Sequence, residues 1–135
     1  MAQTTLCFDF GNTRQKYAVF NGADLQDVIL LENTSAGELM KVVERHQPDK
    51  TILSSVIDHE PAVEKVLSEG SRLHVLSHKT ILPFTTPVGK PSTIGADRLA
   101  LVAAAVNLFP GRNNLAIALG TCITYNFVNR NHEFL

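Results

Sequence analysis

Eight consecutive residues near the N-terminus carry groups suited to chemistry on a phosphate. They read DFGNTRQK and run from Asp9 to Lys16. A turn rich in Gly, Asn and Thr presents N–H groups and hydroxyls to phosphate oxygens, and the cations offset their charge. An aspartate at the end of a strand could hold a hydrated Mg²⁺ against the same phosphates. The residues predicted to bind here are Asp9, Gly11, Asn12, Thr13 and Lys16, with Asp9 as the metal ligand. The alternative is a plain hairpin.

The segment GADR, residues 95–98, supplies a candidate base. Asp97 would lie in the first turn of a helix, where it could accept the proton of a substrate hydroxyl that attacks phosphorus. Arg98 could grip an anionic group of that substrate with two hydrogen bonds. An aspartate is also a common stabilising residue at this end of a helix. A phosphate-binding hairpin combined with a carboxylate base is the arrangement of a kinase.

A third segment, LGTCIT, repeats the outline of the first. Gly120 would let a phosphate approach the backbone, and Thr121 or Thr124 could add a hydroxyl. A lone Gly-Thr pair is weak evidence by itself. The segment could contribute to a phosphate site if it faces the first hairpin across a cleft.

The elements that must position these residues follow from the local pattern. TTLCFDF, KYAVFNG and DVILLEN read as three strands of an antiparallel meander. A helix after Asn33, the strand KTILSSV, the helix EPAVEKVLSEG and the strand RLHVLS follow. After an irregular stretch over residues 77–93 come the helix GADRLALVAAAVNLF and a strand-turn-strand over 114–128. This order predicts an α/β domain with a mixed sheet flanked by helices.

Composition narrows the class of protein. The chain has 135 residues, of which 44% are hydrophobic and 19% charged, and this balance is typical of a globular domain. Twelve Lys and Arg against 13 Asp and Glu leave no basic surface for nucleic acid. Neither a secretory signal nor an apolar run of ~20 residues is visible, so we expect a cytoplasmic protein without a membrane partner. Cys7 and Cys122 are expected to be buried free thiols.

Taken together, the three segments resemble the type III pantothenate kinases, members of the actin-like, sugar kinase and heat-shock ATPase superfamily. DFGNTRQK is similar to that family's D-x-G-N-T-x-x-K. PSTIGADR resembles its P-x-x-x-G-x-D-R, and ALGTCIT resembles its D-x-G-T-A-x-T. The segments occur in the family's order, and the resemblance spans nearly the whole chain.

The resemblance implies a ribonuclease H-like fold of the actin-like ATPase type and ATP-dependent phosphorylation of pantothenate to 4′-phosphopantothenate, the first step of coenzyme A biosynthesis. It also implies ATP, Mg²⁺ and a monovalent cation, K⁺ or NH₄⁺, as cofactors, and a homodimer. Thr121 inherits a nucleotide contact. The pantothenate-facing residues are Gly95, Ala96, Asp97 and Arg98, with Asp97 as the general base.

Three positions depart from the family's pattern. Ala118 replaces the aspartate associated with the monovalent cation, which puts that site in doubt. Asn126 stands near a place where the family often carries another acid, and Val88 replaces a tyrosine that lines the pantothenate pocket. Residues 1–113 are expected to form the first lobe and 114–135 the beginning of a second, truncated lobe. The family's chains are considerably longer, so this chain is expected to be either a fragment or a degenerate relative. A fragment is favoured, because a chain ending on NHEFL directly after a fresh hairpin is expected to lack a packed terminus.

Three other functions remain alternatives. A nuclease of the ribonuclease H type would need several converging carboxylates, but TILSSV supplies serines where its fourth-strand acid should be. A non-catalytic nucleotide-binding or regulatory relative is favoured by Ala118 and Asn126. It is opposed by the retained polar residues Asp9, Lys16, Asp97 and Arg98. A different kinase of the same superfamily could be excluded only by its acceptor pocket.

Overall fold

The computed structural model describes residues 2–87, 89 and 91–135. The chain divides into two compact units, Met1–Val75 and Leu76–Leu135. This division differs from the expected lobes, 1–113 and 114–135, which stay a prediction about the complete fold.

The first unit is built on a five-stranded sheet with the order β3-β2-β1-β4-β5. Its strands are β1 (Thr4–Phe10), β2 (Gln15–Asn21), β3 (Asp24–Leu30), β4 (Lys50–Ser55) and β5 (Arg72–Val75). Strands β1, β2 and β3 pair antiparallel, whereas β4 runs parallel to both β1 and β5. The predicted meander and mixed sheet are therefore confirmed.

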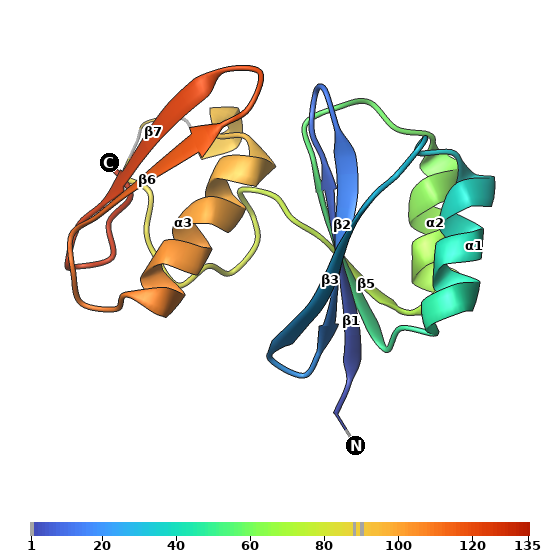
Figure 1. The fold of residues 1–135 in the computed structure, drawn as a ribbon. Coiled ribbons are helices and arrows are strands. Elements are labelled where there is room, and N and C mark those ends of the chain that lie inside the picture. Colours follow the sequence, from blue (N-terminus) through green and yellow to red (C-terminus); the bar gives the residue numbers. More distant parts are fainter. Residues whose placement is uncertain (1, 88, 90) are drawn as a thin grey trace. The chain divides into compact units, whose positions relative to one another are not determined.

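Two helices, α1 (Ala36–His46) and α2 (Pro61–Gly70), lie on one face of this sheet (Figure 1). Ser35 caps α1, since its hydroxyl accepts the Glu38 N–H at 3.3 Å, and Pro61 begins α2. Alternate strand residues face the helices and form the core. The fully or almost fully buried members of this core are Leu6, Phe8, Phe10, Tyr17, Leu39, Val42, Leu53, Val63 and Leu67.

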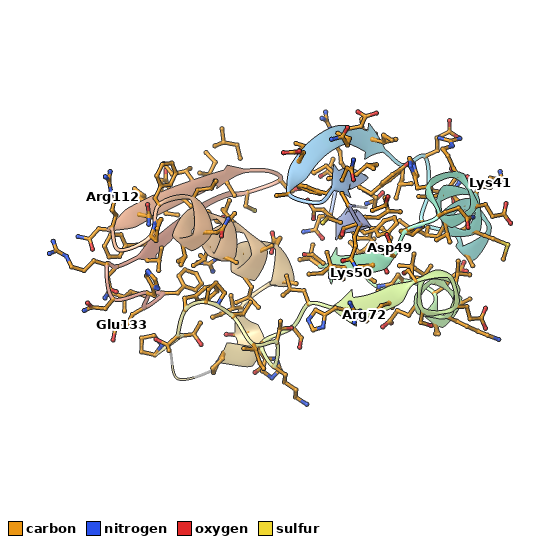
Figure 2. The ribbon with its side chains drawn as sticks, turned by 90° about the horizontal axis from the view of Figure 1, so that it is seen from below. Lys41, Asp49, Lys50, Arg72, Arg112 and Glu133 are labelled. Atoms are coloured by element: carbon orange, nitrogen blue, oxygen red, sulfur yellow. The ribbon has the colours of Figure 1, made fainter. Side chains whose placement is uncertain are left out.

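The other face of the sheet carries the polar residues of interest. Asp9 is paired in register with Lys16 on β2 and with Ser54 on β4, so these three side chains share a face. They lie towards the carboxyl ends of β1 and β4. The charged residues Lys50 and Arg72 are paired at the opposite end of the parallel strands, next to Asp49 (Figure 2).

The second unit contains a short 3₁₀ helix, η1 (Pro91–Thr93), then α3 (Ala96–Leu108) and a hairpin of β6 (Asn114–Leu119) and β7 (Ile123–Val128). Both strands of the hairpin pack on α3 (Figure 1). Single β-bridges tie Thr85 to Glu133 and Val128 to Phe134. The C-terminal residues are therefore paired both with the hairpin and with the segment before η1, so the expectation of an unpacked terminus is wrong.

Two simpler properties can also be compared with the sequence predictions. Cys7 is partly buried but Cys122 is exposed, so the prediction of two buried thiols is wrong for Cys122. The apolar stretch around Cys122 suggested burial, yet the residue lies in the β6–β7 turn. Within the described ranges, no helix has the length and apolarity needed to cross a membrane.

Candidate functional site

Residues 11–14 form the turn between β1 and β2. The Gly11 N–H donates to the Arg14 carbonyl at 3.0 Å, and the Gln15 side chain donates to the Gly11 carbonyl at 2.7 Å. Gly11 therefore closes the turn, while Asn12 and Thr13 are exposed. Phosphate contacts by these residues stay a prediction.

Asp9 and Lys16 face one another across this hairpin. The Lys16 Nζ lies 3.7 Å from Asp9 Oδ2, and the two side chains are 46% and 43% exposed, respectively. An ion pair this exposed contributes little to the free energy of folding. Asp9 and Lys16 can therefore separate and bind other charged groups at a small energetic cost. The carboxylate and the ammonium group are accordingly accessible to a metal ion and to a phosphate.

Ser54 is a polar residue of this face that sequence reasoning passed over. It is only 8% exposed, and its Oγ has no hydrogen-bond partner among the described residues. A buried hydroxyl without a partner is costly, and such groups often mark a site for water, an ion or a ligand. From the sequence, this serine indicates only that the fourth-strand acid of a nuclease is absent. Its position beside Asp9 depends on the strand register, which no local pattern reveals.

Cys7 also lies on this face, two residues before Asp9 on β1. Burial raises the pKa of the Cys7 thiol, which keeps it protonated at neutral pH. Because the thiolate is the reactive form, a protonated Cys7 thiol is a poor nucleophile.

Asp9 is the carboxylate that this face of the sheet offers, beside Lys16 and Ser54, to a divalent cation. Among the described residues, no three His, Cys, Asp or Glu side chains gather into a metal-binding group. Mg²⁺ fits Asp9 nevertheless, because it commonly binds one or two carboxylates and fills its remaining positions with water and substrate phosphates. Ala118 offers only a methyl group, so the predicted monovalent cation lacks its expected carboxylate.

The second candidate segment lies at the N-terminus of α3. Gly95 is the N-cap residue, and among the residues that the structure describes no side chain caps the helix there. Ala96 and Asp97 open the first turn, and Asp97 is exposed. The N–H groups and dipole of a helix N-terminus favour an anion. The predicted acceptor segment therefore combines an exposed carboxylate with a place for a negative charge.

Arg98 makes two side-chain contacts within the second unit. Its Nε donates to Asn126 Oδ1 at 2.6 Å, and its guanidinium carbon lies 5.5 Å from the centroid of the Phe134 ring. Sequence reasoning treated Asn126 only as a departure from the family and did not consider Phe134. The inward register of Asn126 on β7, beside buried Val128, is the signal that could have identified it.

Thr121 lies in the β6–β7 turn, where it is exposed. The Gly120 N–H donates to the Cys122 carbonyl at 3.2 Å and closes this turn. Asp9 and Lys16 are thus brought together in the first unit, whereas Gly95–Arg98 and Thr121 belong to the second. Proximity of Asp9 to Asp97 stays a prediction, as do the assigned roles. Val88 lies outside the described residues.

Comparison with known proteins shows the family. A sequence model described as "Type III pantothenate kinase" matches residues 5–135. The chain belongs to the type III pantothenate kinase family. This confirms the resemblance expected from the three segments.

Curated relatives extend this finding and show its limit. Type III pantothenate kinases of Flavobacterium johnsoniae and Christiangramia forsetii are 35% and 38% identical to this chain, each over 96% of it and 54% of the relative. That of Bacteroides fragilis is 38% identical over 92% of the chain and 51% of the relative. The chain thus spans about half the length of the curated relatives it matches.

Proposed function

We propose that the protein, in its whole form, transfers the γ-phosphoryl group of ATP to pantothenate and yields 4′-phosphopantothenate and ADP, on an actin-like ATPase fold. The observation that carries the proposal is the solvent-accessible pair Asp9–Lys16 on the first hairpin of a chain in this family. An acid and a cation at the carboxyl end of a strand suit a Mg²⁺-bound polyphosphate.

The proposed mechanism assigns each group a separate task. Lys16 and the turn hold the ATP phosphates, and Arg98 holds the pantothenate carboxylate. Asp97 takes the proton of the primary hydroxyl while that oxygen bonds to the γ-phosphorus and the bond to the ADP oxygen breaks. A Mg²⁺ ion at Asp9 would neutralise charge on the phosphates. A monovalent cation takes no part in this mechanism, because the Ala118 side chain provides no oxygen ligand.

A coupled assay of ADP release, with and without pantothenate, tests the proposal on the longest form that can be expressed. We expect pantothenate-dependent turnover, and a loss of kcat of about 10²–10⁴-fold for Asp97→Asn because the general base is removed. Asp24→Asn, at an exposed position that begins β3, is the matched control and should retain full activity.

The other outcomes distinguish the alternatives. Saturable nucleotide binding without turnover would contradict the kinase and support the binding module favoured by Ala118. Phosphorylation of another alcohol but not of pantothenate would support a different kinase of the superfamily. Equal activity in Asp97→Asn and the wild type would remove Asp97 from the mechanism.

A further inference from the structure

The guanidinium group of Arg98 is held from two directions. Asn126 accepts its Nε–H at 2.6 Å, and the Phe134 ring lies 5.5 Å from its central carbon. A guanidinium group is planar and donates two parallel hydrogen bonds most effectively when its plane is fixed in advance. Because Asn126 accepts the hydrogen bond of Nε, the two terminal amino groups of the guanidinium are the donors suited to a carboxylate.

Asn126 is itself rigidly held. It is 0% exposed, and its Nδ2 donates to the Ala116 carbonyl and to Thr124 Oγ1, each at 3.2 Å. The orientation of the amide follows from chemistry, because Arg98 can only donate and a carbonyl can only accept. The amide oxygen must therefore face Arg98. Since both the oxygen and the nitrogen of this buried amide are hydrogen-bonded, the side chain holds Arg98 in a fixed orientation.

Phe134 provides a second fixed surface. It is 3% exposed, and its ring packs edge-on against Phe84 with the centroids 6.0 Å apart. Its N–H donates to the Thr85 carbonyl at 2.8 Å. The ring beside Arg98 is thus anchored through both its backbone and its side chain, and it attracts the cation by its π face.

The support is neutral, and this affects what Arg98 can bind. None of the ion pairs found among the described residues includes Arg98. An amide and a phenyl ring orient the guanidinium group without cancelling its charge. A guanidinium group oriented by neutral neighbours, at the N-terminus of α3, suits a carboxylate-bearing acceptor.

We propose that Asn126 and Phe134 are positioning residues that pre-orient Arg98 for the carboxylate of the acceptor. The inference rests on the proposed function, since it takes Arg98 as the acceptor-binding group. It gives Asn126 a role in the site, whereas the sequence indicates only that an acid often carried near this position in the family is absent.

Steady-state kinetics on the longest form that can be expressed test this role with two acceptors. Pantothenate carries the carboxylate, and pantothenol has a hydroxymethyl group in its place. Asn126→Leu should raise the pantothenate KM about tenfold because the guanidinium group loses its support, and leave the ATP KM within about twofold. It should also lower the preference for pantothenate over pantothenol, a ratio that general destabilisation would not change.

Charge and orientation are separated by a second variant. Asn126→Asp keeps an oxygen facing Arg98 but loses both amide donors and adds a negative charge that offsets the guanidinium group, so its pantothenate KM should rise and its melting temperature fall. Asn131→Asp makes the same change at an exposed position and should alter neither. If Asn126→Leu does not fold, Phe134→Leu replaces it, with an expected rise in pantothenate KM of about threefold.

Two results would overturn the inference, and they differ from a failure of the proposed function. An unchanged preference between the acceptors in Asn126→Leu or its replacement, in an enzyme that uses pantothenate, would remove the positioning role alone. A changed preference between pantothenate and pantothenol in Asn126→Leu that does not also occur in Arg98→Ala would likewise remove the positioning role. Absence of any pantothenate-dependent turnover in the wild type would overturn the proposed function and this inference together.

Discussion

The hairpins β1–β2 and β6–β7 share a strand-turn-strand outline but differ in their surroundings. In the first, Phe8, Phe10 and Tyr17 are buried beneath α1 and α2. In the second, the large apolar residues lie on the face away from α3 and are exposed: Leu115, Ile117, Leu119, Ile123, Tyr125 and Phe127. The face towards α3 instead carries small or polar residues and Val128. The same strand-turn-strand pattern can therefore place its apolar residues in a core or on a surface.

The two hairpins also differ in charge. Asp9 and Lys16 form an ion pair across the first, whereas the corresponding cross-strand pair of the second is Ala118 and Thr124. Only the first hairpin thus offers both a metal ligand and a cation near its turn. The second offers backbone groups and hydroxyls, which can contact a nucleotide but cannot neutralise it.

Truncation of an apolar residue should show the largest difference between the hairpins. Phe8 is 2% exposed, so Phe8→Ala should lower the free energy of unfolding by about 3–5 kcal/mol through lost burial and a cavity. Ile117 is 49% exposed, so Ile117→Ala should lower it by less than about 1 kcal/mol. Urea titrations of the 135-residue chain followed by circular dichroism give both values. Equal losses would contradict the assignment of the two apolar faces.

The elements could be predicted from sequence because their signals are local. Ser35 and Pro61 mark helix starts, and alternation of apolar residues marks β1. Contacts between distant residues could not be predicted in this way. The pair Arg98–Asn126 joins residues 28 apart in sequence, and Ser54 meets Asp9 only through the parallel register of β1 and β4. Motifs identified Asp9 and Arg98 as candidates, but their supporting residues depend on tertiary structure.

Charge removal should separate activity from stability in the first hairpin. Asp9→Asn should lower kcat by about 100-fold or more, because it removes the proposed Mg²⁺ ligand. Its free energy of unfolding should change by less than about 1 kcal/mol, since the pair with Lys16 is exposed. Coupled kinetics and urea titration on the same preparations measure both.

Glu69→Gln provides the matched control for this charge removal. It breaks another exposed ion pair, with Lys65 at 3.9 Å on α2, and should leave kcat unchanged. A full-activity Asp9→Asn enzyme would show that the polar character of the first hairpin has no role in catalysis.

The turn glycines should also respond differently. A Cβ at Gly11 would lie 3.0 Å from the Arg14 carbonyl oxygen, which belongs to the backbone and has little freedom to move. Gly11→Ala should therefore destabilise by about 1–2 kcal/mol. At Gly120 the nearest atom, the Cys122 carbonyl oxygen, would lie 3.8 Å away, and Gly120→Ala should change stability by less than about 0.5 kcal/mol. Thermal melts that rank the two variants in the reverse order would contradict the observed turn geometry.

The smallest effect concerns the pH dependence of the first hairpin. The Tyr17 hydroxyl lies 3.1 Å from His46 Nε2, and burial, aided by the charge of Arg45, lowers the pKa of His46 below 6.5. The unfolded chain therefore takes up a proton as the pH falls below about 6.5, before the native chain does, and stability falls with it. A protonated imidazole also cannot accept a hydrogen bond from the Tyr17 hydroxyl group.

Replacement of His46 tests this pH dependence. Urea midpoints should show that the stability advantage of wild type over His46→Gln at pH 7.5 shrinks towards pH 5. His78→Gln makes the same substitution at an exposed position and provides the control. A constant difference between wild type and His46→Gln across this range would mean that protonation of His46, which is part-buried beside Tyr17, does not affect folding. The first hairpin would then differ from the second in packing and charge but not in its response to pH.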